Sequence, residues 1–137
     1  LMAQPLVRRP CYDCAEPVVP TADLLRQLGL DAERFYAGGY EAPDVPNARE
    51  IPPGTFLAAR GCPMCSGVGY RGRTGIYEML VVDDPLRQLT LEKADASTIR
   101  ASAMQRGMKT LRMDGALKAL AGLTTPEAVL LATAESE

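Results

Sequence analysis

Four cysteines in two pairs are the residues of this chain whose types and spacing could do chemistry. Cys11 and Cys14 form one CxxC pair, Cys62 and Cys65 form the other, and the sequence contains no other cysteine and no histidine. Two residues between two thiols allow a tight turn to direct both sulfurs at one metal ion, so two pairs supply four thiolates for a tetrahedral Zn²⁺. Four protein ligands leave no open position, and the pattern therefore predicts a structural zinc site rather than a catalytic one.

The predicted zinc site joins two distant parts of the chain. Residues 15–61 separate the two pairs, a longer gap than in a compact zinc ribbon. Closing such a loop costs roughly 3 to 4 kcal/mol of chain entropy, whereas structural zinc contributes roughly 10 kcal/mol or more. We therefore expect the metal to hold together the two ends of the long segment, residues 15–61.

Three other uses of the cysteines remain open on these residues. Two disulfides would suit a secreted protein, but the first residues carry no charged leader and no apolar signal core. A thioredoxin-like redox pair would need one CxxC in a βαβ context, which the pattern does not indicate. An iron site of the rubredoxin type would use the same four ligands. Zinc is the interpretation that the two pairs favour.

The composition indicates a folded chain without a dedicated nucleic-acid surface. Of the 137 residues, 47% are hydrophobic and only 5% aromatic, and the formal net charge is −2. Acidic and basic residues are well mixed along the chain, which disfavours a nucleic-acid-binding ribbon. No apolar run approaches the roughly 18 residues that span a bilayer. Because the chain begins with Leu1 rather than an initiator Met, we expect a piece of a longer protein.

Local patterns predict the elements that must position the first cysteine pair relative to the second. Thr21 and Asp31 are expected to cap two short helices, and Gly29 to end the first. Prolines and paired glycines predict an irregular loop over residues 37–54. Residues 55–58 are expected to form a short strand that leads into the second pair.

Beyond the second pair the pattern changes from turns to a strand and then to helices. Glycines at 67, 69, 72 and 75 predict a turn-rich segment. Residues 76–82 are the strongest strand candidate. From Asp83 onward helices are expected, with N-caps and stops at Asp84, Ser97, Gly107, Gly122 and Thr125.

The side chains of the helical half are assigned to core or surface by their spacing. The Leu and Met stripes of residues 99–131, Met113 among them, are expected to pack in the core. Lys109 and Arg112 are expected to form surface ion pairs with Asp114. The predicted fold class is α+β, mainly α, with a tetracysteine zinc-knuckle subdomain, a short strand and a C-terminal helical bundle.

Several motifs resemble known families. Residues 62–69, CPMCSGVG, resemble one copy of the repeat in DnaJ-type co-chaperones, which carry several copies whereas this chain has one. The glycines of this motif can take positive φ and bring backbone N–H groups to the thiolates. A wider resemblance is to the C-terminal region of type II secretion and type IV pilus assembly ATPases, the GspE/PilB family. Its motifs are AQPLVRRPC at 3–11, GYRGRTGIYE at 69–78, GMKTLRMDG at 107–115 and GLTTPE at 122–127.

The GspE/PilB resemblance implies a domain organisation. Residues 1–10 would end a truncated upstream ATPase core, 11–70 would form the zinc subdomain, 71–82 a connecting strand and 83–137 a C-terminal helical subdomain. The sequence has no GxxxxGK[ST] phosphate loop and no Walker B-like acidic strand. ATP and Mg²⁺ are therefore expected only in the parent protein, and this chain alone is not expected to hydrolyse ATP.

The resemblance also implies partners and a function. The chain would couple the ATP-driven motion of a hexameric motor to inner-membrane platform proteins, in the cytoplasm at the inner face of a bacterial membrane. Arg73 and Arg71 would lie near the nucleotide or a subunit interface, while Arg8 and Arg9 are expected to be surface charges. A free-standing zinc adaptor, similar to a co-chaperone, is the alternative function.

Overall fold

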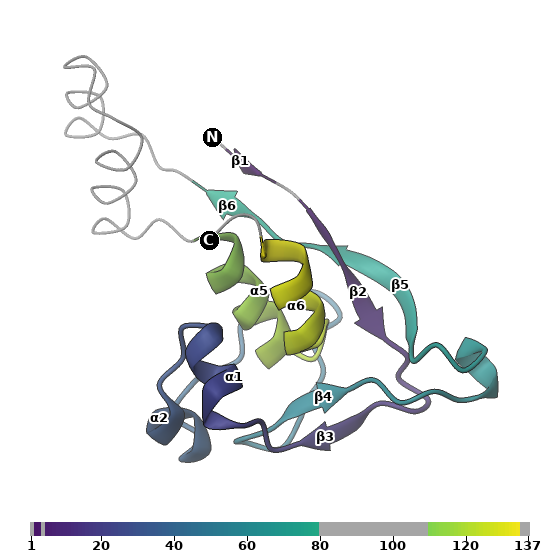
Figure 1. The fold of residues 1–137 in the computed structure, drawn as a ribbon, viewed down its shortest axis with the longest axis horizontal. Helices are drawn as coiled ribbons and strands as arrows, with labels where there is room; N and C mark the ends of the chain where they lie inside the picture. The colour runs from purple at the N-terminus through teal and green to yellow at the C-terminus, as the bar shows by residue number, and fades with distance from the viewer. Residues whose placement is uncertain (1, 4, 80–109, 135–137) are drawn as a thin grey trace.

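The computed structural model describes residues 2–3, 5–79 and 110–134. Within these residues the chain has an α+β fold, as predicted, with four α-helices and three pairs of short antiparallel strands. Figure 1 shows the helices gathered on one side, one strand pair near the N-terminus, and the other two strand pairs leading toward the right-hand end of the molecule. That end holds the turns that carry the cysteines.

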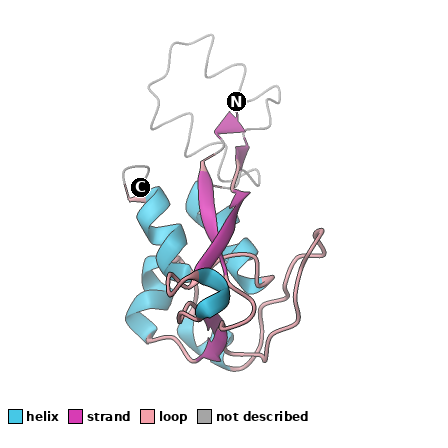
Figure 2. Ribbon diagram, turned by 90° about the vertical axis from the view of Figure 1, so that its right-hand side faces the viewer, coloured by secondary structure: helices cyan, strands magenta, loops and turns pink. Residues whose placement is uncertain are grey.

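Each strand pair joins residues that are far apart in the sequence. The long pair is β2, Leu6–Pro10, with β5, Tyr70–Gly75, and its register shifts between Arg8 and Pro10. In Figure 2 these two strands run side by side next to the helices. The shorter pairs are β3, Glu16–Val18, with β4, Phe56–Ala58, and β1, Met2–Ala3, with β6, Glu78–Met79.

The strand predictions were confirmed in one place and wrong in another. β4 lies where residues 55–58 predicted a strand. The glycine-rich segment predicted to be turns instead contains β5, and among residues 76–79 only Glu78 and Met79 are in a strand. β5 forms because four of its residues pair with β2, and such long-range pairing overrides local strand propensity. Gly72, with φ +79, supplies the conformation that the irregular register needs.

The two short helices of the first half begin at the predicted caps. α1, Ala22–Gln27, is capped by Thr21, whose hydroxyl accepts the N–H of Leu24, and the chain leaves it through Gly29 at φ +80. α2, Ala32–Tyr36, is capped by the Asp31 carboxylate. Residues 37–54 then contain no helix or strand, as expected from their prolines.

The two C-terminal helices follow each other in the chain and are joined by a short turn. α5, Leu111–Leu120, is capped by Thr110, and α6, Pro126–Thr133, is capped by Thr125 with Pro at its first position. The predicted stop at Gly122, φ +76, and the predicted cap at Thr125 are both confirmed. The helices approach closely at Gly115, where a Cβ would lie 2.5 Å from Cγ1 of Val129.

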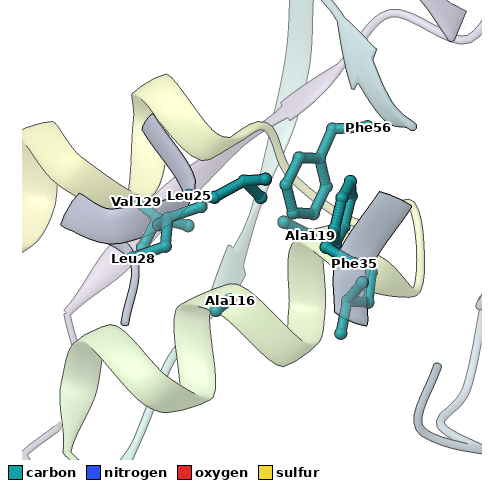
Figure 3. Close-up of a cluster of buried hydrophobic side chains, with 8 residues drawn as sticks. Leu25, Leu28, Phe35, Phe56, Ala116, Ala119 and Val129 are labelled. Atoms are coloured by element: carbon teal, nitrogen blue, oxygen red, sulfur yellow. The ribbon is translucent and has the colours of Figure 1, made fainter. Parts of the chain in front are cut away.

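The main core joins both halves of the chain. Phe35 of α2 and Phe56 of β4 place their ring centroids 4.7 Å apart, beside Ala119 of α5 (Figure 3). Leu25 and Val129, each fully buried, extend this cluster across α1 and α6. A second cluster packs the long strand pair on the C-terminal helices through Val7, Ile76, Leu111 and Ala128.

Part of the predicted helical core was wrong. Met113 is 41% exposed and Leu131 is 76% exposed. The face of α5 that packs inward is formed by Leu111, Leu120 and the small residues Ala116 and Ala119, and close approach of α6 requires a small residue at Gly115.

The predicted ion pair between Arg112 and Asp114 was also wrong. Asp114 is buried and pairs with Lys118 at 3.3 Å, while its carboxylate also accepts the N–H of Tyr77 at 2.9 Å. Arg112 donates instead to the hydroxyl and carbonyl of Thr133. The predictions for residues 80–82, for the helices from Asp84 and Ser97, for the stop at Gly107 and for Lys109 lie outside the described residues.

Candidate metal centre

The four predicted ligands come together at the corner where two strand pairs meet. Residues 11–14 turn the chain from β2 into β3, and residues 62–65 turn it from β4 into β5. Because β2 pairs with β5 and β3 with β4, the two turns are brought face to face (Figure 1, right-hand end). The N–H of Cys11 donates to the carbonyl of Gly69 at 2.8 Å, which fixes one turn to the other.

The sulfur positions match a tetrahedral thiolate site. All four Sγ atoms lie within 4.8 Å of one another. The Sγ–Sγ distances are 3.8 Å for Cys11–Cys62, 3.9 Å for Cys14–Cys65 and 3.7 Å for Cys62–Cys65. A zinc tetrahedron with Zn–S bonds of about 2.3 Å has edges of about 3.8 Å, so the cluster has the size of such a tetrahedron. The cysteines are free, and no disulfide joins them.

Backbone N–H groups surround the sulfurs of the site. Gly69 donates to Sγ of Cys65 at 3.1 Å, Cys62 donates to the same sulfur at 3.3 Å, and Gly61 donates to Sγ of Cys14 at 3.3 Å. Gly69 has φ +87 and Gly61 has φ +139, conformations that favour glycine. The predicted glycine-assisted approach of backbone to thiolate is therefore confirmed. Such donors stabilise the ionised sulfur that a metal requires.

The surroundings move the pKa values of two ligands in opposite directions. Burial raises the pKa of the Cys11 thiol from 9.0 to about 11. Hydrogen bonds with the three neighbouring thiols contribute to the rise. Burial also opposes ionisation of Cys65, but donation from the N–H groups of Cys62 and Gly69 and from the other thiols outweighs it. The pKa of Cys65 therefore falls from 9.0 to about 6. Hydrogen-bond donation thus favours the thiolate form of Cys65, the form that binds a metal ion.

A tyrosine inside the first cysteine pair connects the corner to the helices. The hydroxyl of Tyr12 donates to the carbonyl of Gly122, in the turn between α5 and α6, at 2.9 Å. The guanidinium of Arg49 lies 3.9 Å from the centroid of the Tyr12 ring. No motif of the sequence indicates a role for Tyr12, and its place between the two cysteines is its only signal.

The two arginines predicted to act near a nucleotide or an interface both lie on β5. Arg71 pairs with Asp13 at 3.6 Å, and both side chains are more than half exposed. Arg73 is exposed and stands opposite Arg8 across the long strand pair. Arg8 lies over the Tyr70 ring at 4.0 Å and Arg9 lies 5.6 Å from the Tyr12 ring. Arg9 is only half-buried overall, but its Nε atom is fully buried.

The helices give no indication of a membrane span. Among the described residues, none of the helices has the length and apolar character needed to cross a bilayer.

Comparison with known proteins places this corner and its helices in a family. The family model described as "Type II/IV secretion system protein" matches residues 1–131. The type IV pilus assembly ATPase PilB of Thermus thermophilus is 40% identical over 98% of this chain and 13% of its own length. The type II secretion system protein E of Pectobacterium carotovorum is 35% identical over 98% of this chain and 23% of its own.

A third relative agrees with these two in extent. The type II secretion system ATPase E of Vibrio cholerae is 33% identical over 99% of this chain and 23% of its own length. The chain therefore spans less than a quarter of each of these relatives. The resemblance drawn from the cysteine, glycine and arginine motifs is confirmed, and the chain belongs to the type II/IV secretion system protein family.

Proposed function

We propose that this chain is the zinc-stabilised C-terminal region of a secretion or pilus assembly ATPase, and that it couples motion of the motor to its partners. The observation that carries the proposal is a cluster of four sulfurs with tetrahedral spacing inside a chain of this family. Relatives named as ATPases of type II secretion and type IV pilus assembly support the motor assignment.

Cys11, Cys14, Cys62 and Cys65 would hold the zinc ion. When bound, the ion supplies a cross-link and no reaction, because four thiolates fill a tetrahedral shell. The cross-link closes a loop whose entropy cost is roughly 4 kcal/mol, and structural zinc offsets that cost with roughly 10 kcal/mol or more. The corner between the strand pairs then behaves as a stiff joint.

The chain's own contacts suggest how this joint could transmit motion. β2 and β5 lead from the corner toward the N-terminal residues, while Tyr12 connects the corner to the turn between α5 and α6. A displacement that enters through the long strand pair would move the helices with it, because both are fixed to the same cross-linked turn. We assign the partners of this lever as the upstream ATPase core, neighbouring subunits of a hexamer and inner-membrane platform proteins.

The remaining parts of the proposal concern the longer protein. ATP and Mg²⁺ would bind in the upstream core. The domain boundaries of this chain at residues 10, 70 and 82 remain predictions. Arg73 and Arg71 remain candidates for a nucleotide or subunit contact. The location would be the cytoplasm at the inner face of the bacterial membrane.

The test uses the longer protein in a bacterium that depends on it for secretion or piliation. Replacing Cys11 and Cys62 by serine is expected to abolish secretion or piliation while the purified protein keeps ATP hydrolysis within about threefold of wild type. The matched control is Arg26→Ala, an exposed change on α1 that is expected to preserve both activities. Proportional loss of hydrolysis and transport, or loss of neither, would contradict the coupling role.

A further inference from the structure

The four cysteines of the candidate metal centre differ in their access to solvent. Cys11 and Cys65 are buried, at 1% and 6% exposure, whereas Cys14 and Cys62 are half-buried. Each CxxC pair therefore contributes one inner and one outer ligand. A molecule that arrives from solution meets the two outer ligands first, so any reaction at the centre is expected to begin at Cys14 or at Cys62.

The two outer ligands differ in the backbone groups that reach their sulfurs. Sγ of Cys14 accepts the N–H of Gly61 at 3.3 Å. Within the part of the chain that the structure describes, no backbone N–H donates to Sγ of Cys62, whose hydrogen-bonding neighbours are the sulfurs of Cys11 and Cys65. Because N–H donors disperse the negative charge of a thiolate, Cys62 keeps more of that charge on its sulfur than Cys14 does.

This difference matters most when a metal ion is bound. All four ligands are then thiolates, so their relative reactivity depends on the electron density of each sulfur and on access to it, rather than on the fraction that is ionised. A thiolate of lower basicity is also a weaker nucleophile. Donation from Gly61 therefore weakens Cys14 as a nucleophile, while Cys62 combines access with an undiminished charge.

The turn that carries Cys62 leaves its surroundings open. Cys62 precedes the short 3-10 helix Pro63–Cys65, which lies at the right-hand end of the molecule in Figure 1, away from the α-helices. Apart from the two cysteines, every residue of 61–68 is exposed. The same turn also places Sγ of Cys65 at 3.7 Å from Sγ of Cys62, so a second thiolate stands next to the reactive one.

We propose that Cys62 is the modification site of the metal centre: it reacts first with soft electrophiles and with hydrogen peroxide, and its oxidation ends in a Cys62–Cys65 disulfide. The proposal rests on the zinc site of the proposed function and adds a reactive residue and a sensitivity to oxidants. The joint between the strand pairs would then be stiff in a reducing environment and loosened by peroxide.

The oxidation consumes one peroxide molecule and two thiolates. The Cys62 thiolate attacks one oxygen of hydrogen peroxide, so that an S–O bond forms, the O–O bond breaks and hydroxide leaves. The Cys65 thiolate then attacks the Cys62 sulfur, so that the S–S bond forms, the S–O bond breaks and a second hydroxide leaves. Two sulfurs are oxidised by two electrons in total, which reduce the peroxide. Only Cys11 and Cys14 remain as thiolates, which is half of the ligand set that a structural zinc ion requires.

The experiment uses the zinc-loaded chain, whose metal content is measured before any treatment. Substoichiometric iodoacetamide ensures that few chains react more than once, and mass spectrometry of the digested protein locates the label. Cys62 is expected to carry at least about five times as much label as Cys14. With hydrogen peroxide, a chromogenic chelator is expected to record zinc release in step with the formation of the Cys62–Cys65 disulfide.

Two ligand replacements separate Cys62 from Cys14. Cys62→His and Cys14→His each leave three thiolates and one imidazole, a ligand set that also holds structural zinc. Only the first removes the Cys62 thiolate, so peroxide is expected to release zinc from it at least about fivefold more slowly than from Cys14→His. Met64→Leu is the matched control, because it removes the other oxidisable sulfur of this turn, 61% exposed, and is expected to release zinc at the wild-type rate.

Several results would overturn the proposal. They are a first label that is shared evenly or found on another cysteine, a disulfide between another pair, and a Cys62→His variant that loses zinc as fast as Cys14→His. If a histidine variant does not bind zinc, the position of the label in the wild type still decides. A chain without zinc before treatment would instead contradict the proposed function, so the two failures are distinguishable.

Discussion

The hydroxyl of Tyr12 donates a 2.9 Å hydrogen bond to the carbonyl of Gly122, across 110 positions of sequence. Tyr12 lies between the first two cysteines, and Gly122, with φ +76, lies in the turn between α5 and α6. The bond is the most direct polar connection between the candidate metal centre and the C-terminal helices. Removing this bond therefore tests how strongly the turn that carries the first two cysteines is attached to the helices, separately from whether the cysteines bind metal.

We expect Tyr12→Phe to weaken this attachment without removing the metal. The substitution leaves a half-buried carbonyl without its donor, which costs about 1 to 2 kcal/mol of unfolding free energy. Urea unfolding of the metal-loaded protein measures the loss, and elemental analysis is expected to give the same metal content as wild type. Loss of metal from this variant would mean that the tyrosine holds the site itself rather than its connection to the helices.

Gly115→Ala tests the close packing of α5 on α6. The added Cβ would lie 2.5 Å from Cγ1 of Val129 and 3.1 Å from its Cγ2, so the helices must separate. We expect a loss of about 1 to 3 kcal/mol in thermal or urea unfolding. Adding Val129→Ala should remove the clash, making the double variant less destabilised than the sum of the two single changes. Additive losses would show that the contact does not set the helix spacing.

Asp114→Ala tests the buried ion pair of α5. The Asp114 and Lys118 side chains are only 11% and 15% exposed, and the carboxylate also holds the N–H of Tyr77. Removing it leaves a largely buried ammonium group and a backbone donor without partners, so we expect a loss of about 3 kcal/mol. The matched change is Asp23→Ala, which breaks an exposed pair with Arg26 and is expected to cost about 0.5 kcal/mol. Equal losses for the two variants would contradict a special role for burial.

The cysteine pKa values predict how the stability of the metal-free, reduced chain depends on pH. The folded pKa of Cys65, about 6, lies below its ordinary 9.0, so its contribution is fully present above pH 9 and is lost as pH falls through 6. The folded pKa of Cys11, about 11, lies above 9.0, so its contribution is present below pH 9 and is lost as pH rises through 11. Unfolding free energy is therefore expected to rise from pH 6 to 9 and to fall from 9 to 11. Cys65→Ser should remove the acid limb of this profile, and an unchanged limb would contradict the assignment.

The sequence was most informative where structure depends on neighbouring residues. Thr21, Asp31 and Thr125 could be identified as caps because a side chain reaches a backbone N–H three residues away. The cysteine pairs could be grouped because a tetrahedral ion requires four ligands, and each pair's spacing fits a tight turn. The motifs of the secretion ATPase family were recognisable because each is a short continuous segment of the sequence.

The remaining features depend on contacts that local patterns do not encode. β2 and β5 stabilise each other across sixty or more positions, so the local pattern of the arginines before Cys11 and of the glycines after Cys65 did not indicate a strand. The approach of Val129 requires a small residue at Gly115, whereas Met113 on the same helix is 41% exposed, and the spacing of apolar residues alone does not indicate either fact. The partner of Tyr12 could not be predicted, because nothing near it in sequence points to Gly122.

The most direct test of the central claim is the metal content and coordination of the purified chain. Elemental analysis with zinc-edge X-ray absorption is expected to give one zinc per chain, bound by four sulfurs at about 2.3 Å. Serine at Cys11, Cys14, Cys62 or Cys65 should reduce the sulfur number or abolish binding. A chain without zinc, an iron ion in its place, a first shell containing nitrogen or oxygen, or disulfides between the four cysteines would contradict the account.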